Sequence, residues 1–248
     1  MLLAITLTLI FITGILAGFV GALGGPGGLI SLPFLIFTGL PPHIAIATNK
    51  FGNIGMKTSV LLKLWKKKKI IWNYILPLSI AAIIGAFIGT TLLIKSPPEI
   101  ITKIIGIVIL LTLPIIFIKK DLGIKRKQTG KIKKVIGYIF YLTTRILSGF
   151  LEAGTGPLTS FILMIFFGFT IIESIATSKI PGIILSIVSL TILASNGIIN
   201  YFYGAILLVG MLIGGYLGAR IAIKKGDRWV KMAFGVIIVI SAIKLVFF

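Results

Sequence analysis

The sequence predicts an all-α polytopic membrane protein, built as two inverted repeats of about five helical segments each. Three observations support this fold class. Of the 248 residues, 57% are hydrophobic and only 12% are charged. The apolar residues gather in runs long enough to cross a hydrocarbon core of about 30 Å. The motif Ala47-Thr48-Asn49-Lys50 returns in the second half as Ala176-Thr177-Ser178-Lys179, which indicates a duplicated unit.

Five apolar segments are expected in each half of the chain. In repeat one, residues 1–118, they are residues 2–23, 29–40, 44–64, 70–94 and 100–118. In repeat two, residues 135–248, they are residues 135–151, 158–169, 171–194, 198–223 and 229–248. The basic stretch of residues 119–134 is the expected cytoplasmic linker. Because neither repeat should be stable alone, residues 1–248 are expected to form a single transmembrane domain.

Glycines at corresponding places support this pairing of segments. They lie in the first, fourth and fifth segment of each half. The matched pairs are Gly18 with Gly149, Gly85 with Gly214, Gly89 with Gly218, and Gly106 with Gly235. Phe19 and Phe150 follow the first of these pairs. A hydrophobic unit that occurs twice with matched polar and glycine positions is typical of secondary transporters.

The second segment of each half is short, and Gly or Pro flanks it. Whether residues 29–40 and 158–169 cross the membrane fully or re-enter decides the symmetry of the repeats. Short segments beside such loops are typical of broken or re-entrant helices that surrounding protein buries. We therefore expect a broken or re-entrant helix at each glycine-rich loop.

The positions of the basic residues indicate the orientation of the repeats. The net charge is +20, and its clusters are residues 63–69, 119–134 and 224–231, all between apolar segments. This pattern is typical of cytoplasmic loops that face anionic lipid, and it argues against nucleic-acid binding. The loop after the third segment is basic in repeat one (residues 63–69) and uncharged in repeat two (residues 195–197). The loop after the fourth segment shows the opposite contrast: it is nearly neutral in repeat one (residues 95–99) and basic in repeat two (residues 224–228).

If basic loops are cytoplasmic, corresponding loops lie on opposite sides of the membrane. The repeats are then inverted, each half crosses an odd number of times, and both termini face outward. A parallel arrangement with four crossings per half is the alternative. It would place the basic loop near Lys224 outside, so we favour inversion.

The two glycine-rich loops are candidate binding elements. Glycines let the backbone turn sharply and bring N–H groups close to a solute. A half-helix that begins at such a loop directs unpaired N–H groups and a positive dipole end toward an anion. The alternative is close packing of membrane helices. The candidate residues are Gly24, Gly25, Gly27 and Gly28 in the first loop and Gly154, Thr155 and Gly156 in the second, with the hydroxyls of Thr155 and Thr159 as extra donors.

The repeated motif supplies candidate cations. A lysine well inside a bilayer costs about 2.5–3.5 kcal/mol on insertion scales and normally faces a cavity or a partner. Lys50 and Lys179 are therefore expected to hold an anion, and the polar residues near them are expected to hydrogen-bond it. These are Thr48, Asn49, Asn53, Thr177 and Ser178. Lys57 continues the same polar stripe, but we expect it to extend to the membrane interface.

Three charged residues of the second half have no counterpart in the first, namely Arg145, Glu152 and Glu173, and an interfacial carboxylate explains Glu173. Arg145 and Glu152 are expected to share a helix face, and a structural ion pair is one interpretation. Glu152 is also a candidate for carrying a proton coupled to transport, because it adjoins the second glycine loop.

The residue inventory argues against an enzyme or a metal centre. The chain has no Cys and only one His, His43, and it lacks a His-Glu-x-x-His motif. Too few His and acidic residues are present to assemble a metal site. We expect no cofactor and no metal.

The ordered motifs resemble the sulfite exporter TauE/SafE family. The resemblance covers Gly18-Phe19, the first glycine loop, Gly39-Leu40-Pro41-Pro42-His43 and the motif ending at Lys50, together with their second-half counterparts. It implies a secondary transporter in the cytoplasmic membrane for small anions such as sulfite or organosulfonates. The second glycine loop departs from the first because it is shorter and carries Glu152 where the first repeat has Gly21.

The leading hypothesis is a transporter that moves a small anion by alternating access, with proton coupling as an open question. A passive anion channel that uses the same basic site is the alternative. A membrane enzyme is a third interpretation, which the residue inventory disfavours.

Overall fold

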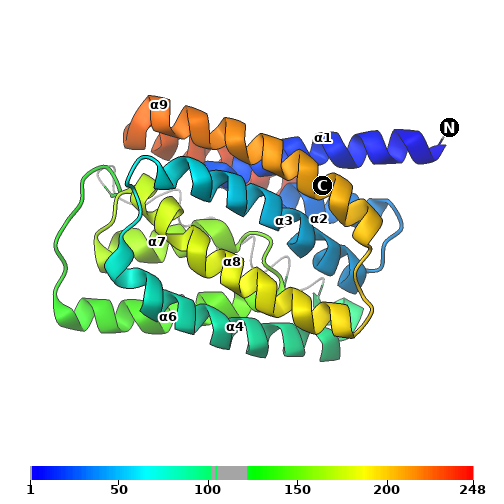
Figure 1. Cartoon of the computed structure of the whole chain (residues 1–248), viewed down its shortest axis with the longest axis horizontal. Helices are drawn as coiled ribbons and strands as arrows, with labels where there is room; N and C mark the ends of the chain where they lie inside the picture. The colour runs from blue at the N-terminus through cyan, green and yellow to red at the C-terminus, as the bar shows by residue number, and fades with distance from the viewer. Residues whose placement is uncertain (1, 102–103, 105–121, 248) are drawn as a thin grey trace.

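The computed structural model describes residues 2–101, 104 and 122–247. Most of the expected segment 100–118, with Gly106, lies outside the described residues. The elements within them are all helical. They are α1 (Leu2–Ala22), α2 (Gly28–Phe37), α3 (Pro42–Trp65), the 3-10 helix η1 (Trp72–Tyr74), α4 (Ile75–Lys95), α6 (Lys131–Phe150), α7 (Thr155–Phe167), α8 (Ile171–Ser195) and α9 (Tyr201–Phe247) (Figure 1).

The structure confirms an all-α polytopic membrane protein. Within the described part of the chain, four helices are long and apolar enough to cross a bilayer, namely those of residues Leu3–Ala22, Trp72–Lys95, Ile171–Ser195 and Tyr201–Ala233. Side chains such as Ile80, Phe87 and Leu76 on α4 are exposed on the outer face, where lipid replaces water as the solvent. Helices suit this setting because they satisfy their backbone hydrogen bonds internally.

The two short helices lie where the sequence predicts them. α2 has 10 residues and α7 has 13, and at 1.5 Å per residue they extend only about 15–20 Å. α2 packs against α1 and α3, while α7 packs against α6 and α8. Each short helix is therefore too short to cross about 30 Å of hydrocarbon alone, and longer helices of its own repeat flank it.

Helix packing follows the duplicated pattern. In repeat one, α1 and α3 pack against α9. Their counterparts in repeat two, α6 and α8, pack against α4. The third helices of the two repeats, α3 and α8, also pack on each other. Each repeat thus packs its first and third helices on the fourth helix of the other. In Figure 1, α1 and α3 run from right to left, whereas α6 and α8 run from left to right.

The matched glycines sit at these shared packing surfaces. A Cβ added at Gly89 would lie 2.0 Å from the Ile146 carbonyl oxygen, and one at Gly149 would lie 2.3 Å from that of Gly85. In the other pair of helices, a Cβ at Gly18 would lie 2.4 Å from the Met211 carbonyl oxygen. Glycine at these positions lets the helix backbones approach closely.

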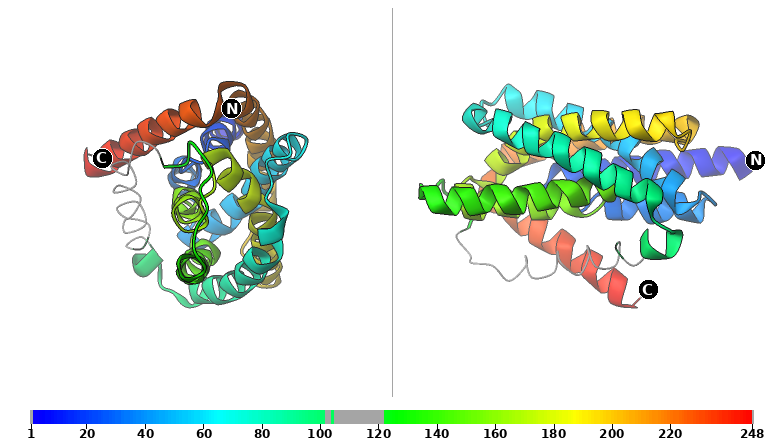
Figure 2. Two further views of the ribbon diagram at one scale, coloured as in Figure 1. Left: turned by 90° about the vertical axis from the view of Figure 1, so that its left-hand side faces the viewer. Right: turned by 90° about the horizontal axis from the view of Figure 1, so that it is seen from below.

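The described residues of the basic stretches, 63–69, 122–134 and 224–231, gather at one end of the molecule, on the left in Figure 1. The linker reaches α9 there, where the Lys231 ammonium donates to the Leu122 carbonyl, 2.7 Å away. α9 also breaks there, at Gly226, whose φ is 78° and ψ is 177°. This break separates the two segments that the sequence predicts as residues 198–223 and 229–248. Figure 2 shows the later part of α9 turning away from the helix bundle.

Candidate functional site

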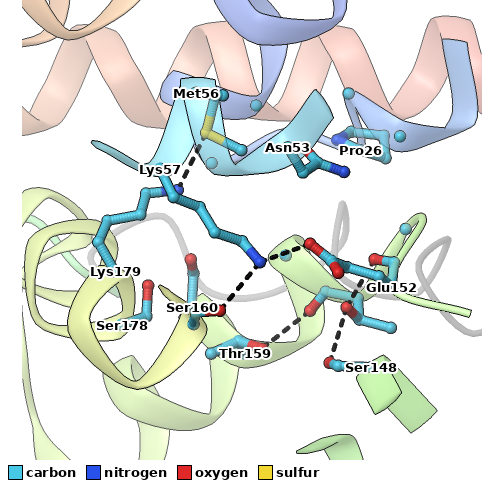
Figure 3. A pocket seen from close by; sticks show the side chains of 18 of the residues that line it. Pro26, Asn53, Met56, Lys57, Ser148, Glu152, Thr159, Ser160, Ser178 and Lys179 are labelled. Atoms are coloured by element: carbon cyan, nitrogen blue, oxygen red, sulfur yellow. Dashed lines mark hydrogen bonds and ion pairs between the residues drawn. The ribbon is translucent and has the colours of Figure 1, made fainter. Parts of the chain in front are cut away.

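A cavity of about 80 Å³ lies where the two glycine loops meet helices of both repeats. This volume is several times the roughly 10–15 Å³ that one water molecule needs. Its lining comes from the two glycine loops and from α3, α6, α7 and α8 (Figure 3). The predicted site residues that line it are Gly24, Gly25, Gly27, Gly28, Asn53, Arg145, Glu152, Gly154, Thr155, Gly156, Thr159, Ser178 and Lys179.

The glycine loops bring the backbones of the two repeats together. A Cβ added at Gly28 would lie 2.8 Å from the Ala153 Cα, so a larger residue would push the two loops apart. Gly24 and Gly154 both have positive φ, 84° and 79°, a conformation that glycine adopts without a steric penalty. The local sequence thus permits both turns and the close approach between them.

Each loop leads into the N-terminus of a short helix at the cavity. α2 begins at Gly28 and α7 at Thr155, and both residues line the cavity. The first-turn N–H groups of a helix lack carbonyl partners within the helix, and they carry the positive end of its dipole. The cavity therefore receives partial positive charge from the backbone of both repeats.

Lys179 brings a full positive charge into this space. It is only 9% exposed, and its ammonium lies 3.6 Å from the Met56 sulfur (Figure 3). A thioether is a weak acceptor. The one ion pair within the described residues joins Lys57 to Glu152, so no described carboxylate neutralises Lys179.

The structure corrects the expectation that Lys57 extends to the interface. Its ammonium is buried and donates to Glu152 Oε1 (2.5 Å), the Gly182 carbonyl (3.0 Å) and Ser186 Oγ (2.6 Å). Lys57 lies one helical turn after Asn53 on α3, and both residues line the cavity. A charged partner from repeat two keeps Lys57 inside the protein.

Arg145 and Glu152 do not share a helix face. Glu152 lies beyond the last residue of α6, Phe150, and has a φ of 61°. The Arg145 guanidinium instead donates to Thr159 Oγ1 and lies 4.8 Å from the centre of the Tyr141 ring. Both side chains still line the same cavity.

Four predicted binding residues lie outside the cavity lining, and each contacts another part of the protein. Lys50 donates to the carbonyls of Ser148 (3.0 Å) and Gly149. The remaining three are acceptors within the helix packing. Thr48 Oγ1 accepts from the Asn200 N–H, Asn49 Oδ1 from the Ser31 hydroxyl, and Thr177 Oγ1 from the Ile71 N–H.

The cavity also contains residues that the sequence prediction missed. The sequence offered little indication of these residues, because side chains such as Met56 and Leu185 are ordinary apolar residues of a membrane helix. Lys57 had the clearest signal, its place one turn after Asn53. The missed lining residues are Gly21, Pro26, Met56, Lys57, Ser148, Ser160, Ile175, Gly182 and Leu185.

Comparisons with known proteins agree with a membrane transporter. The profile described as "Sulfite exporter TauE/SafE" matches residues 10–245. A "Probable membrane transporter protein" of Haemophilus influenzae is 27% identical over 91% of this chain and 88% of its own length. "Probable membrane transporter protein ORF9" of a Sinorhizobium species is 24% identical over 96% of this chain and 92% of its own. "Probable membrane transporter protein YfcA" of Escherichia coli K12 is 25% identical, over 97% and 90%. No solved structure matches the chain significantly.

Proposed function

The chain belongs to the sulfite exporter TauE/SafE family, and from this premise we propose that it is a secondary transporter of small sulfur-containing anions, sulfite or an organosulfonate. The family and the probable transporters similar to the chain establish the coarser statement, a multi-pass membrane transporter in the cell membrane. The anion and the mechanism are the proposal.

The observation that carries the proposal is the buried Lys179 ammonium in the cavity. Three cationic side chains, Lys57, Lys179 and Arg145, face one carboxylate there, that of Glu152. Burying a charge without a partner is strongly unfavourable, so an anion that enters the cavity gains the interaction that Lys179 lacks. The excess of positive charge favours anions over cations and neutral solutes.

The shape of the site suits a small oxyanion. Positive groups approach from several directions: the ammonium of Lys179 on α8 and the positive dipole ends of α2 and α7, which begin at Gly28 and Thr155. A sulfite or sulfonate group presents several oxygens on one sulfur, and hydrogen bonds from charged donors to such oxygens are short and strong. The cavity volume of about 80 Å³ suits a small anion.

The placement of the cavity supports alternating access. Residues of both repeats line it, and corresponding helices run in opposite directions in Figure 1. In transporters built from inverted repeats, one repeat rocks against the other around a fixed site near the midplane. We infer that the chain works in this way, opening the cavity to each side of the membrane in turn.

Reconstitution into liposomes tests the proposal. We expect vesicles that hold the purified protein to take up sulfite, sulfate, thiosulfate or sulfoacetate faster than protein-free vesicles. Preloading with the unlabelled anion should produce a transient overshoot of labelled anion, because a carrier exchanges solute. A passive channel gives uptake without an overshoot at zero membrane potential, and that result would replace the carrier by the channel.

A Lys179→Ala variant tests the site. We expect its initial uptake rate to fall about ten- to a hundredfold, since a hydrogen bond to a charged group contributes about 1.5–3 kcal/mol. Lys67→Ala is the matched control, because it removes a lysine from the exposed loop after α3. A Lys179→Ala protein that inserts normally and transports at the full rate would refute the assignment.

A further inference from the structure

The Lys57–Glu152 pair already contains the kind of contact that a transported anion would make. The carboxylate of Glu152 is a negatively charged oxygen group, and it lies 2.5 Å from the Lys57 ammonium inside the cavity (Figure 3). The two side chains are only 10% and 7% exposed. The protein thus supplies its own anion to one of the cations in the proposed binding site.

The second oxygen of Glu152 has a different environment. Glu152 Oε2 is buried and has no hydrogen-bond donor among the described protein groups. A carboxylate oxygen without a donor can accept a proton and then donate a hydrogen bond in turn. One oxygen of Glu152 therefore holds the cation, and the other is open to a proton.

The backbone at Glu152 keeps the carboxylate at this place. Its φ of 61° lies in the left-handed region, which is uncommon for residues other than glycine. The corresponding position in repeat one is Gly21, and the position corresponding to Lys57 is Ser186. The ion pair has no equivalent in the other repeat, so it marks a function that the two repeats do not share.

We propose that Glu152 competes with the transported anion for Lys57, so that one proton on Glu152 accompanies each anion across the membrane. This inference rests on the proposed function. When Glu152 is ionised, its carboxylate holds Lys57. When a proton binds to Glu152, the carboxylate becomes a neutral acid, the ion pair is broken, and the Lys57 ammonium binds the incoming anion.

The protons balance through the cycle. A proton from the aqueous phase forms an O–H bond on Glu152, and an anion takes the place of the lost negative charge beside Lys57. On the opposite side the anion leaves, the proton returns to water, and Glu152 binds Lys57 again. The lysine remains an ammonium throughout, and no other reactant is needed.

Few other titratable groups face Glu152. Lys179 on α8 and Arg145 on α6 line the same cavity, and Lys50 on α3 binds the nearby carbonyls of α6. The helices α1, α2 and α7 carry no titratable side chain. Glu152 is thus the carboxyl group at this cavity, and its neighbours there are cations.

The test is accumulation of an anion against its own gradient. Proteoliposomes are held at zero membrane potential with potassium and valinomycin, and the outside is made one pH unit more acidic. The probes are thiosulfate, sulfate and sulfoacetate, whose charge is constant near neutral pH. With one proton per anion, the wild type should concentrate the transported probe about tenfold, since a factor of ten per pH unit is the equilibrium limit.

Glu152→Gln should abolish this accumulation, because the amide cannot exchange a proton and does not hold Lys57 as an anion. Glu152→Asn is a second variant whose side chain tolerates the left-handed backbone. Glu173→Gln is the matched control: its carboxylate accepts from the Thr170 N–H at the start of α8, and glutamine can replace it there. We expect Glu173→Gln to accumulate anion as the wild type does.

The outcomes separate this inference from the proposed function. Tenfold accumulation by Glu152→Gln or Glu152→Asn would overturn the role of Glu152. Wild-type vesicles that equilibrate a probe without concentrating it would overturn the coupling even if neither variant folds, while the transport function would stand. If the vesicles with protein take up the probes and sulfite no faster than protein-free vesicles, the proposed function and this inference are both overturned.

Discussion

Lys50 and Lys179 occupy matched positions in the two repeats, yet their ammonium groups have different surroundings. Lys50 binds the last carbonyls of α6, those of Ser148 and Gly149. The final carbonyls of a helix lack partners within the helix and carry its negative dipole end. Lys50 therefore joins α3 of repeat one to the end of α6 in repeat two, while Lys179 extends into the cavity.

This difference predicts opposite effects on stability. Lys50→Met should lower the free energy of unfolding by about 1–3 kcal/mol, because the buried Ser148 carbonyl loses its charged donor. The Gly149 carbonyl also loses Lys50 but still accepts from the Thr90 hydroxyl. Lys179→Met should keep or increase the stability, because it removes a buried charge that has no carboxylate partner. Thermal unfolding of the two purified variants in detergent measures this. An equal loss in both would contradict the distinction.

The sequence predicted which types of residue the candidate site contains better than it predicted which individual residues line the cavity. Lys179, Glu152 and the glycine loops were identifiable because charge and glycine are rare or repeated inside apolar segments. The different environments of Lys50 and Lys179 could not be predicted, since their motifs are nearly the same. They depend on which neighbouring helix end lies within reach, and only the packing of the two repeats decides that.

At the scale of elements, glycines fix how closely paired helices approach. α4 meets α6 where Gly85 and Gly89 face the backbone of residues 145–150, and α1 meets α9 where Gly18 faces Met211. The repeated glycines therefore shape the surfaces between the two repeats, while the glycine loops shape the cavity. Close packing, one of the two interpretations that the sequence left open for glycine, applies at these helix pairs, and binding by the glycine loops stays a prediction.

Gly89→Ala should lower the free energy of unfolding by about 1–3 kcal/mol, the usual penalty for overpacking. Its new Cβ would lie 2.0 Å from the Ile146 carbonyl oxygen, which forces α4 and α6 apart. Gly130→Ala is the control, because a Cβ there meets nothing within 4 Å. Thermal unfolding of both variants is the measurement. Equal stability of the two would show that the helices adjust freely.

Most helix bounds were predictable to within a few residues, and the exceptions have a physical cause. α6 begins at Lys131 rather than at residue 135, because a helix can extend beyond the membrane with charged residues that hydropathy does not detect. The two last segments form one helical element broken at Gly226. Apolar runs report burial in lipid, whereas helix ends depend on local backbone geometry.

At the scale of the molecule, the described residues of the three basic stretches share one end, although they come from distant parts of the chain (Figure 1). This common end agrees with the prediction that all three face the cytoplasm. The opposite directions of corresponding helices then place α3's end and α8's end on different sides. The inverted topology itself remains a prediction.

Single-cysteine labelling tests that topology, and the chain suits it because it has no native Cys. We expect Asn196→Cys to react with a membrane-impermeant maleimide in intact cells, and Lys67→Cys to react only after permeabilisation. Both positions are exposed and lie at the ends of corresponding helices, α8 and α3. If both cysteines react only after permeabilisation, the repeats are parallel and the alternating-access proposal loses its support.

The packing of α1 against α9 can form only after both helices have been synthesised. Gly14 and Gly18 meet Leu207, Gly210 and Met211, residues that are translated about 180 positions after α1 is complete. At roughly 5–20 residues per second this delay lasts roughly ten to forty seconds. The glycine face of α1 therefore has no α9 backbone to pack against until α9 is synthesised.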